Sequence, residues 1–314
     1  MSGIISGPVR TLVAYRRQAV ICLMLLFLCG CTTTVKPYSS GSLPPPTNNK
    51  ISDKDKIGHL PVKDLVAAGN SYLAHGNDSM AELYFSVALA KEADSIPALF
   101  GIGEILRHRG HFETARGKFE QILSRNPGYS PALLALGRIS REQGDYNSAI
   151  KHLNKALALE PEDPGIITEL AITYDDLDQE PQAEPLYREV VKIKPDLASA
   201  HNNLGVNLLL QGRYPEAISE LSRALNLAPR NKKTQNNLAT AFLLNGEAGK
   251  ALRVFENSVG KAAAYNNVGF LYMSKGLYDK AQKAFEEALA IDPIFYLKAQ
   301  QNLERLSQLR NASH

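Results

Sequence analysis

Cysteine is scarce in this chain and is confined to its beginning. The 314 residues include three cysteines, Cys22, Cys29 and Cys31, and none follows position 31. A disulfide framework and catalysis by a thiol are therefore excluded for the rest of the sequence.

Net charge is also small. The whole chain carries +3 at pH 7, and Arg10, Arg16 and Arg17 account for that surplus. The remaining 32 basic residues balance the 32 acidic ones. No basic stripe interleaved with aromatic side chains is present, which argues against nucleic acid as a ligand. The same balance gives no support for electrostatic binding to a membrane surface.

Motifs for catalysis are missing as well. The sequence contains neither an H-E-x-x-H motif nor a phosphate-binding loop. His108 and His111 flank a turn and could chelate a metal, but no carboxylate or thiol accompanies them, so a solvated turn is favoured. Asp175 and Asp176 resemble a carboxylate pair but fall at a predicted helix end on the surface. We expect a protein that is not an enzyme, with no catalytic residue, metal or cofactor.

A period of 34 residues organises the sequence. Pro127, Pro161, Pro195 and Pro229 recur at that interval, and a fixed period in this range indicates stacked supersecondary units. Alanine keeps the same phase at positions 81, 115, 149, 183 and 217. Such phase-locked small residues indicate packing rather than chemistry.

One unit shows what is repeated. Leu99, Ile102 and Leu106 fall about one helical turn apart, and Gly110 can end that helix in the left-handed conformation. A second apolar stripe follows, and Pro127 ends it because proline cannot continue a helix. The unit is therefore predicted to be helix, tight turn, helix, turn.

The spacing of Leu99, Ile102-Gly103, Ala115, Phe119 and Pro127 resembles the tetratricopeptide repeat pattern. The resemblance implies an all-α solenoid, a right-handed superhelix of helical hairpins. We expect Gly103 to let the paired helices approach closely, with Ala115 at the same contact. A polar-backed capping helix and tail at residues 296–314 would close the stack. The seven predicted repeats are residues 62–95, 96–129, 130–163, 164–197, 198–231, 232–261 and 262–295.

The fourth unit is irregular. Asp178 replaces the glycine of the helix–helix turn, Pro181 suits a first helical turn, and Pro185 lies deeper, where it should remove a hydrogen bond. The favoured interpretation is a second helix that starts late. The alternative is a bend in the superhelix or a contact with a partner.

The N-terminus indicates export. Arginines precede an uncharged apolar run, Ala19–Leu28, which is about 15 Å long as a helix and too short to span a bilayer. Residues 1–30 fit a signal peptide. Leu28-Cys29-Gly30-Cys31 resembles the bacterial lipoprotein box, which implies lipidation of Cys31; cleavage without lipidation and an uncleaved anchor remain open. Thr32 implies sorting to the periplasmic face of the outer membrane. Residues 31–61 are predicted to be a disordered linker.

A candidate binding groove follows from the family resemblance. In this family the first helix of each repeat lines the concave face, and its fifth and sixth positions point into the groove. Asparagine pairs occupy these positions in the last three units. The amides could grip a peptide backbone, or they could only bond a neighbouring helix. Phe100 and Leu134 occupy the fifth position in two earlier units, where we expect them to be exposed. The candidate groove residues are Asn202, Asn203, Asn236, Asn237, Asn266 and Asn267, with Lys233, Thr240, Phe270 and Met273 beside them.

The lipobox, the repeats and the short sixth unit together are similar to the TadD lipoproteins of the Flp (tight-adherence) pilus system. That resemblance implies a non-catalytic scaffold that assists assembly of a pilus or a related secretion apparatus. Its partner would be a periplasmic or outer-membrane protein such as a secretin. The alternative is a lipoprotein adaptor for cell-wall enzymes, or for export of outer-membrane proteins or polysaccharide.

Overall fold

The computed structural model describes residues 57–292 and 296–311. Every regular element in these ranges is a helix, which confirms the all-α tetratricopeptide repeat fold. Two helices fall within each predicted repeat range, except that α15 begins one residue early, at Lys261. The helices are α3 (Val62–Ala74), α4 (Asp78–Lys91), α5 (Ile96–His108), α6 (Phe112–Arg125), α7 (Ser130–Glu142), α8 (Tyr146–Leu159), α9 (Pro164–Asp176), α10 (Glu180–Ile193), α11 (Ala198–Leu210), α12 (Tyr214–Leu227), α13 (Lys232–Leu244), α14 (Ala248–Val259), α15 (Lys261–Ser274), α16 (Tyr278–Ile291) and α17 (Tyr296–Asn311).

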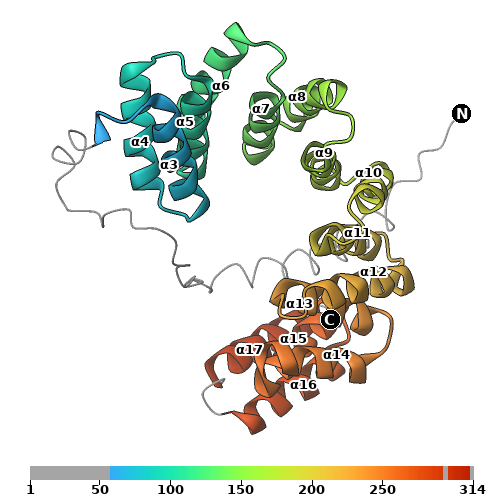
Figure 1. The fold of residues 1–314 in the computed structure, drawn as a ribbon. Helices are drawn as coiled ribbons and strands as arrows, with labels where there is room; N and C mark the ends of the chain where they lie inside the picture. The colour runs from blue at the N-terminus through green and yellow to red at the C-terminus, as the bar shows by residue number, and fades with distance from the viewer. Residues whose placement is uncertain (1–56, 293–295, 312–314) are drawn as a thin grey trace, which may run out of the picture. The chain divides into compact units, whose positions relative to one another are not determined.

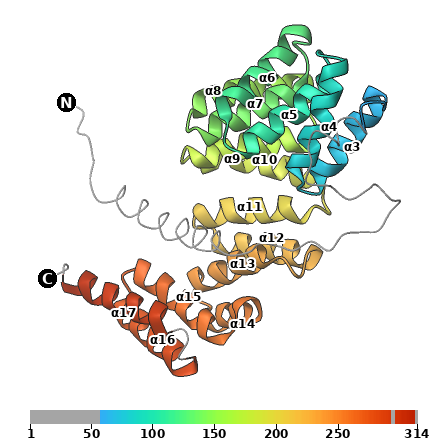
Figure 2. The same ribbon diagram turned by 90° about the vertical axis from the view of Figure 1, so that its left-hand side faces the viewer.

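The chain divides into two compact units between Gln179 and Glu180. We call residues 57–179 the N-terminal unit and residues 180–292 with 296–311 the C-terminal unit. Within each unit, antiparallel helical hairpins follow one another along the chain (Figures 1 and 2). The odd-numbered helices from α3 to α17 are called A helices, and the even-numbered ones are called B helices.

The hairpins that lie within one unit are each held by a large side chain of the B helix that packs against a small residue of the A helix. Phe85, Phe119, Leu221 and Phe285 are each 0 % exposed. A Cβ atom added at Gly103 would lie 2.6 Å from the Phe119 ring. The glycine therefore makes room chiefly for the aromatic ring, while Ala115 is also fully buried nearby.

The turns inside the hairpins explain a second set of glycines. The residue two positions after each A helix from α3 to α15 has a positive φ, for example 76° at Gly110 and 79° at Gly212. Asp178 takes this place in the fourth repeat with φ 62°. An L-residue in that conformation costs about 1–2 kcal/mol, although aspartate tolerates it better than most.

The prediction of a late second helix in the fourth repeat is wrong. α10 begins at Glu180, at the same place in the repeat as the other B helices, and Pro185 lies inside it. Pro181 lies in the first turn, where a backbone N–H would have no hydrogen-bond partner within the helix. Of the two prolines, only Pro185 therefore removes a backbone hydrogen bond from α10. Burial of Ala183, Tyr187 and Val190 offsets that loss.

The last helix covers the end of the stack. α17 buries Ala299 and Leu306, while Lys298, Glu304 and Arg305 are exposed. None of the described helices is long and apolar enough to cross a membrane. The predicted signal peptide, Cys31 and the linker up to residue 56 lie outside the described residues.

Candidate binding site

The asparagine pairs lie on three successive A helices of the C-terminal unit. Asn202, Asn236 and Asn266 form what we call the first asparagine row, and Asn203, Asn237 and Asn267 form the second. Three of the six are nearly buried: Asn202, Asn236 and Asn237 are 5–7 % exposed. The other three are partly exposed.

Hydrogen bonds connect the rows across repeats. Nδ2 of Asn237 donates to Oδ1 of Asn202 over 3.0 Å, and that oxygen also accepts from the Thr234 hydroxyl over 3.2 Å. The same connection returns at the end of the stack, where Nδ2 of Asn302 donates to Oδ1 of Asn266 over 2.8 Å. In both cases the second-row position of one A helix donates to the first-row position of the preceding A helix.

The short sixth repeat interrupts this pattern. Oδ1 of Asn236 accepts from the Ser258 hydroxyl of α14 over 3.2 Å. Nδ2 of Asn267, which would be its counterpart, is buried and has no hydrogen-bond partner among the residues that the structure describes. α14 ends at Val259, and Gly260, with φ 87°, leads directly into α15. Where the normal connecting loop is lost, the hydrogen bond expected between Asn267 of α15 and Asn236 of α13 is also missing.

The side chains near the rows differ in exposure. Lys233 is exposed and Phe270 is half-buried, whereas Thr240 and Met273 are 4 % and 5 % exposed. A ligand could therefore reach Asn203, Asn266, Lys233 and Phe270 directly. Asn202, Asn236 and Asn237 would instead hold their neighbours in place.

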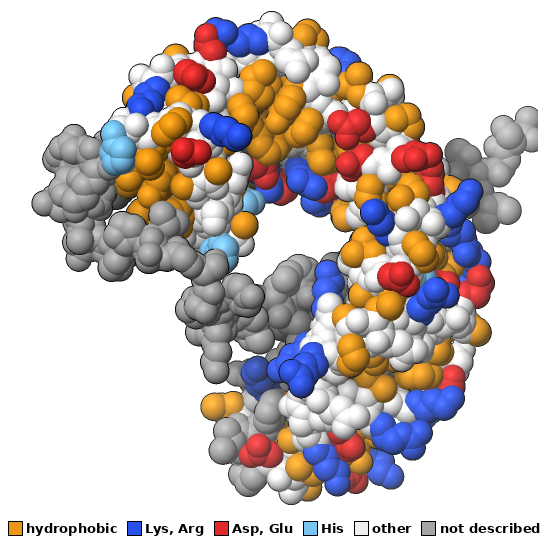
Figure 3. Space-filling view, viewed as in Figure 1, with side chains coloured by type: hydrophobic (Ala, Val, Ile, Leu, Met, Phe, Trp, Pro, Cys, Tyr) orange, Lys and Arg blue, Asp and Glu red, His pale blue; other side chains and the backbone are white. Residues whose placement is uncertain are grey.

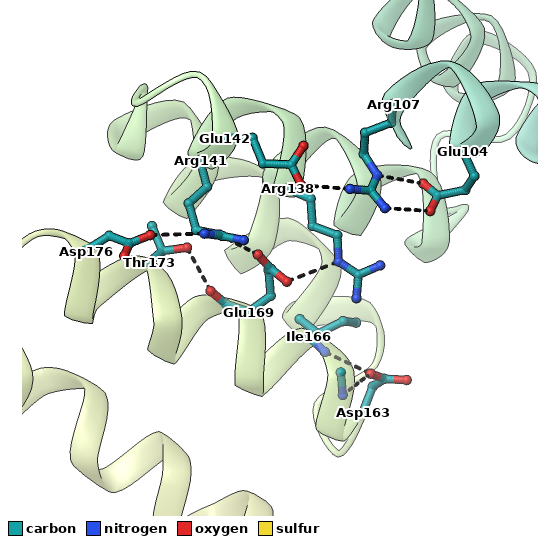
Figure 4. Close-up of polar contacts among 11 residues, drawn as sticks. Glu104, Arg107, Arg138, Arg141, Glu142, Asp163, Ile166, Glu169, Thr173 and Asp176 are labelled. Atoms are coloured by element: carbon teal, nitrogen blue, oxygen red, sulfur yellow. Dashed lines mark hydrogen bonds and ion pairs between the residues drawn. The ribbon is translucent and has the colours of Figure 1, made fainter. Parts of the chain in front are cut away.

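A charged network on the A helices of the N-terminal unit was missed by the sequence reasoning (Figure 4). Glu169 of α9 is 7 % exposed and accepts from two arginines of α7. The Glu169 carboxylate oxygens lie 3.1 Å from Nε of Arg138 and 2.6 Å from Nε of Arg141. Arg141 also bonds Asp176 over 3.1 Å. Burial alone would lower the pKa of Arg141, but the charges and hydrogen bonds of Glu169 and Asp176 outweigh it and raise that pKa.

A second part of the network joins α5 and α7. Arg107 bonds Glu104 of its own helix over 3.1 Å and Glu142 over 2.7 Å. These ion pairs link neighbouring repeats, as the asparagine bonds do in the C-terminal unit. The sequence signal was the pair Arg138 and Arg141, spaced three residues apart on one helix face.

The apolar positions of the N-terminal unit are less accessible than expected. Phe100 and Leu134 are half-buried rather than exposed. The Phe100 ring lies 5.6 Å from that of Phe119 and 5.9 Å from that of Tyr129, measured between centroids. The side chain therefore packs within its own repeat and the following loop, because an aromatic ring gains from such contacts.

The weak catalytic candidates are not brought together by the fold. His108, the last residue of α5, and His111 are exposed on either side of a turn. Within the described ranges no three histidine, cysteine or acidic side chains are grouped as a metal site would require. Asp176 is engaged with Arg141, so it is not available as half of a carboxylate pair.

Comparison with known proteins agrees with this architecture. Models of the tetratricopeptide repeat match residues 100–164, 140–204, 198–231 and 262–295. Human protein O-mannosyl-transferase TMTC1 is 37 % identical over 91 residues, which are 28 % of this chain and 10 % of that protein. Bovine BBSome complex member BBS4 is 29 % identical over 115 residues, 35 % of this chain and 22 % of that protein. The matched segments are thus a minor part of either relative.

Two solved structures share the fold. A tetratricopeptide repeat protein from Parabacteroides merdae has a TM-score of 0.55 at 17 % identity, covering 78 % of this chain and 98 % of that one. A thermophilic TPR protein from Thermus thermophilus has a TM-score of 0.50 at 22 % identity, covering 58 % and 100 %. The repeats, their glycine-and-aromatic packing and these matches identify the chain as a member of the tetratricopeptide repeat family, whose proteins generally mediate protein–protein interaction.

Proposed function

We propose that this chain is a non-catalytic scaffold that binds an extended segment of a partner protein along the A helices α11, α13 and α15. The observation that carries the proposal is the pair of asparagine rows. An amide side chain offers both donors and an acceptor, so it can bond peptide backbone whatever the partner's side chains are.

The internal bonds of the rows support this function. Asn237 and Asn302 hold Asn202 and Asn266 in fixed orientations. A surface whose polar groups are already ordered loses less conformational entropy when a ligand binds. Asn203 and Asn266 remain partly exposed and Lys233 is exposed, so all three are available to a partner, and the half-buried Phe270 would add an apolar contact.

We further propose that Cys31 is lipidated and that the chain works at the periplasmic face of the outer membrane in assembly of a Flp/Tad-type pilus or related secretion apparatus. This part of the proposal rests on the lipobox resemblance and on the similarity to TadD lipoproteins. A secretin or another assembly component would then be the partner. An adaptor for cell-wall enzymes, or for export of outer-membrane proteins or polysaccharide, is the second candidate, since it needs the same anchor and the same repeats.

A crosslinking experiment tests the binding surface. A photoreactive amino acid is placed at Asn203 or Phe270, and at the exposed Asn257 on α14 as the control. We expect the same partner to be captured from both A-helix positions and not from Asn257. The substitution Asn203→Ala with Asn266→Ala should reduce capture from Phe270 at least tenfold, while Asn257→Ala should not. Equal capture from all three positions would reject the site.

A separate experiment tests the cellular role. Deletion should reduce surface pili and SDS-resistant secretin multimers, and the wild-type chain should restore both. Cys31→Ala should release the protein from the membrane fraction. Normal pili and multimers in the deletion strain would reject the assembly role, whatever the groove binds.

A further inference from the structure

The two units carry opposite net charge. Residues 57–179 contain 17 acidic and 11 basic residues, a net charge of −6. Residues 180–311 contain 13 acidic and 17 basic residues, a net charge of +4. The balanced total hides this asymmetry, and Figure 3 shows Lys and Arg side chains gathered on the C-terminal unit.

The opposite charges concentrate on structurally equivalent loops. Because each helix is joined by a short turn to an antiparallel one, the loops that connect a B helix to the next A helix lie along one edge of each unit. We call these the acidic edge in the N-terminal unit and the basic edge in the C-terminal unit. Each edge comprises the connecting loops and the first two residues of the following helix.

The acidic edge has no basic residue in its described loops. Glu92 follows α4, and Glu160, Glu162 and Asp163 follow α8. Asp163 caps α9 through backbone N–H groups, and Asp94, also on this edge, pairs with Arg125 over 2.6 Å. The remaining carboxylates, those of Glu92, Glu160 and Glu162, are exposed and have no ion pair within the described part of the chain.

The basic edge reverses this pattern. Its cations are Lys194, Arg230, Lys232, Lys233 and Lys261, against the two acids Asp196 and Asp292. All five cations are exposed, and none has an ion pair among the residues that the structure describes. They come from three successive connections, so they form a row rather than one cluster.

The helix dipoles oppose both sets of charges. Glu92 and Glu160 directly follow the C-terminal ends of α4 and α8, where negative charge is unfavourable. Lys232 and Lys261 are the first residues of α13 and α15, where positive charge is unfavourable. Each edge would therefore be stabilised by a surface of the opposite sign.

We propose that the basic edge of one chain binds the acidic edge of a second copy, so that copies associate head to tail. Both complementary surfaces belong to the same sequence, which favours a second copy over an unrelated acidic protein. An interface between two different patches is heterologous, and it propagates into a ring or a filament instead of stopping at a dimer.

Sedimentation of the full chain in a non-ionic detergent tests the proposal. At 25 mM salt the mean protein mass should rise with concentration, and at 500 mM salt the midpoint of that rise should move to at least tenfold higher concentration, because salt screens exposed charges. A monomer at all concentrations in 25 mM salt would overturn the proposal. If the effect of salt did not depend on protein concentration, the attraction would act within a single chain and not between copies. That result would also overturn the proposal.

Charge reversal locates the interface. The basic-edge variant is R230E/K232E/K261E, and the acidic-edge variant is E92K/E160K/E162K. Each alone should remain monomeric at 25 mM salt, whereas a mixture of the two, or a chain carrying all six changes, should associate.

The matched control is R253E/K283E/R305E, which reverses three exposed cations away from the edge and should associate like the wild type. Circular dichroism confirms that each variant is folded. Equal loss of association in the control would show that net charge alone acts. No recovery in the six-fold variant, whose net charge equals that of the wild type, would show that the two edges do not bind each other. Either result would overturn the edge assignment.

Discussion

Replacing Gly205 by alanine tests the packing that defines the repeat. A Cβ atom at Gly205 would lie 2.6 Å from Cγ of Leu221 and 3.3 Å from the carbonyl oxygen of Ala217. Carbon atoms pack at about 3.5–4.0 Å, so the Leu221 side chain must move by about 1 Å. The Ala217 oxygen belongs to the backbone of α12, so it cannot move without shifting that helix.

The two contributions to the change have opposite signs. Overpacking of this kind costs about 1–3 kcal/mol. Alanine is the better helix former by about 1 kcal/mol. We therefore expect Gly205→Ala to lower the free energy of unfolding by about 1 kcal/mol.

Gly117→Ala supplies the matched control. Gly117 lies in the interior of α6, and a Cβ atom there would meet nothing within 4 Å. Only the helix-propensity difference remains, so this change should raise the free energy of unfolding by about 1 kcal/mol. The sign of the effect thus separates a glycine required by packing from one that is not.

Hydrogen exchange is the appropriate assay, because repeat arrays need not unfold in one step. Amide protection should decrease in α11 and α12 for Gly205→Ala and increase in α6 for Gly117→Ala. Urea unfolding followed by circular dichroism gives the global change. Increased protection of α11 and α12 in Gly205→Ala would refute the packing argument.

Three further changes test other features. Asp178→Gly should stabilise the chain by about 1 kcal/mol, because it removes an aspartate held at φ 62°; a lower urea midpoint would contradict this. Glu220→Ala should cost about 1–3 kcal/mol, since Nδ1 of the buried His201 lies 2.7 Å from the Glu220 carboxylate, while the exposed Glu189→Ala should leave the midpoint unchanged. Burial lowers the pKa of His152, so the unfolded chain binds that proton at higher pH than the folded chain. Stability should therefore fall as the pH drops below about 6.5, and His152→Gln should flatten that decline; an unchanged slope would exclude the histidine as its source.

Periodic residues made the fold predictable. Gly103 and Gly205 occupy the same position in their repeats because a hairpin must place a large B-helix side chain against its A helix. The sequence of one repeat therefore predicts that of the next. The start of α10 was mispredicted because Pro185 is locally unfavourable to a helix, and burial of Tyr187 and its neighbours overrides that preference. Local propensity is a weak guide where tertiary packing decides.

Contacts between repeats were harder to foresee. Arg141 meets Glu169 across 28 positions, and Arg107 meets Glu142 across 35. These pairs are specific to one junction, so no repeated signal marks them. The sequence showed the asparagine rows as groove positions, but it did not show which asparagines would bond each other. Asn237 and Asn267 occupy the same position in the repeat, yet only Asn237 donates a hydrogen bond to the preceding A helix.

The distinction between paired and unpaired polar groups limits where a partner can bind strongly. Arg107 and Arg141 are each matched by two carboxylates, so a ligand that used them would first have to break existing contacts. Lys233 remains accessible without that cost, and the same is true of Glu160 and the other free charges on the edges. Asn203 would exchange only the 3.4 Å contact in which its Oδ1 accepts from Nδ2 of Asn202. In a solenoid whose repeated positions are committed to packing, recognition depends on the residues that vary between repeats and are not already satisfied within the chain. The A-helix face of the C-terminal unit and the two charged edges meet both conditions.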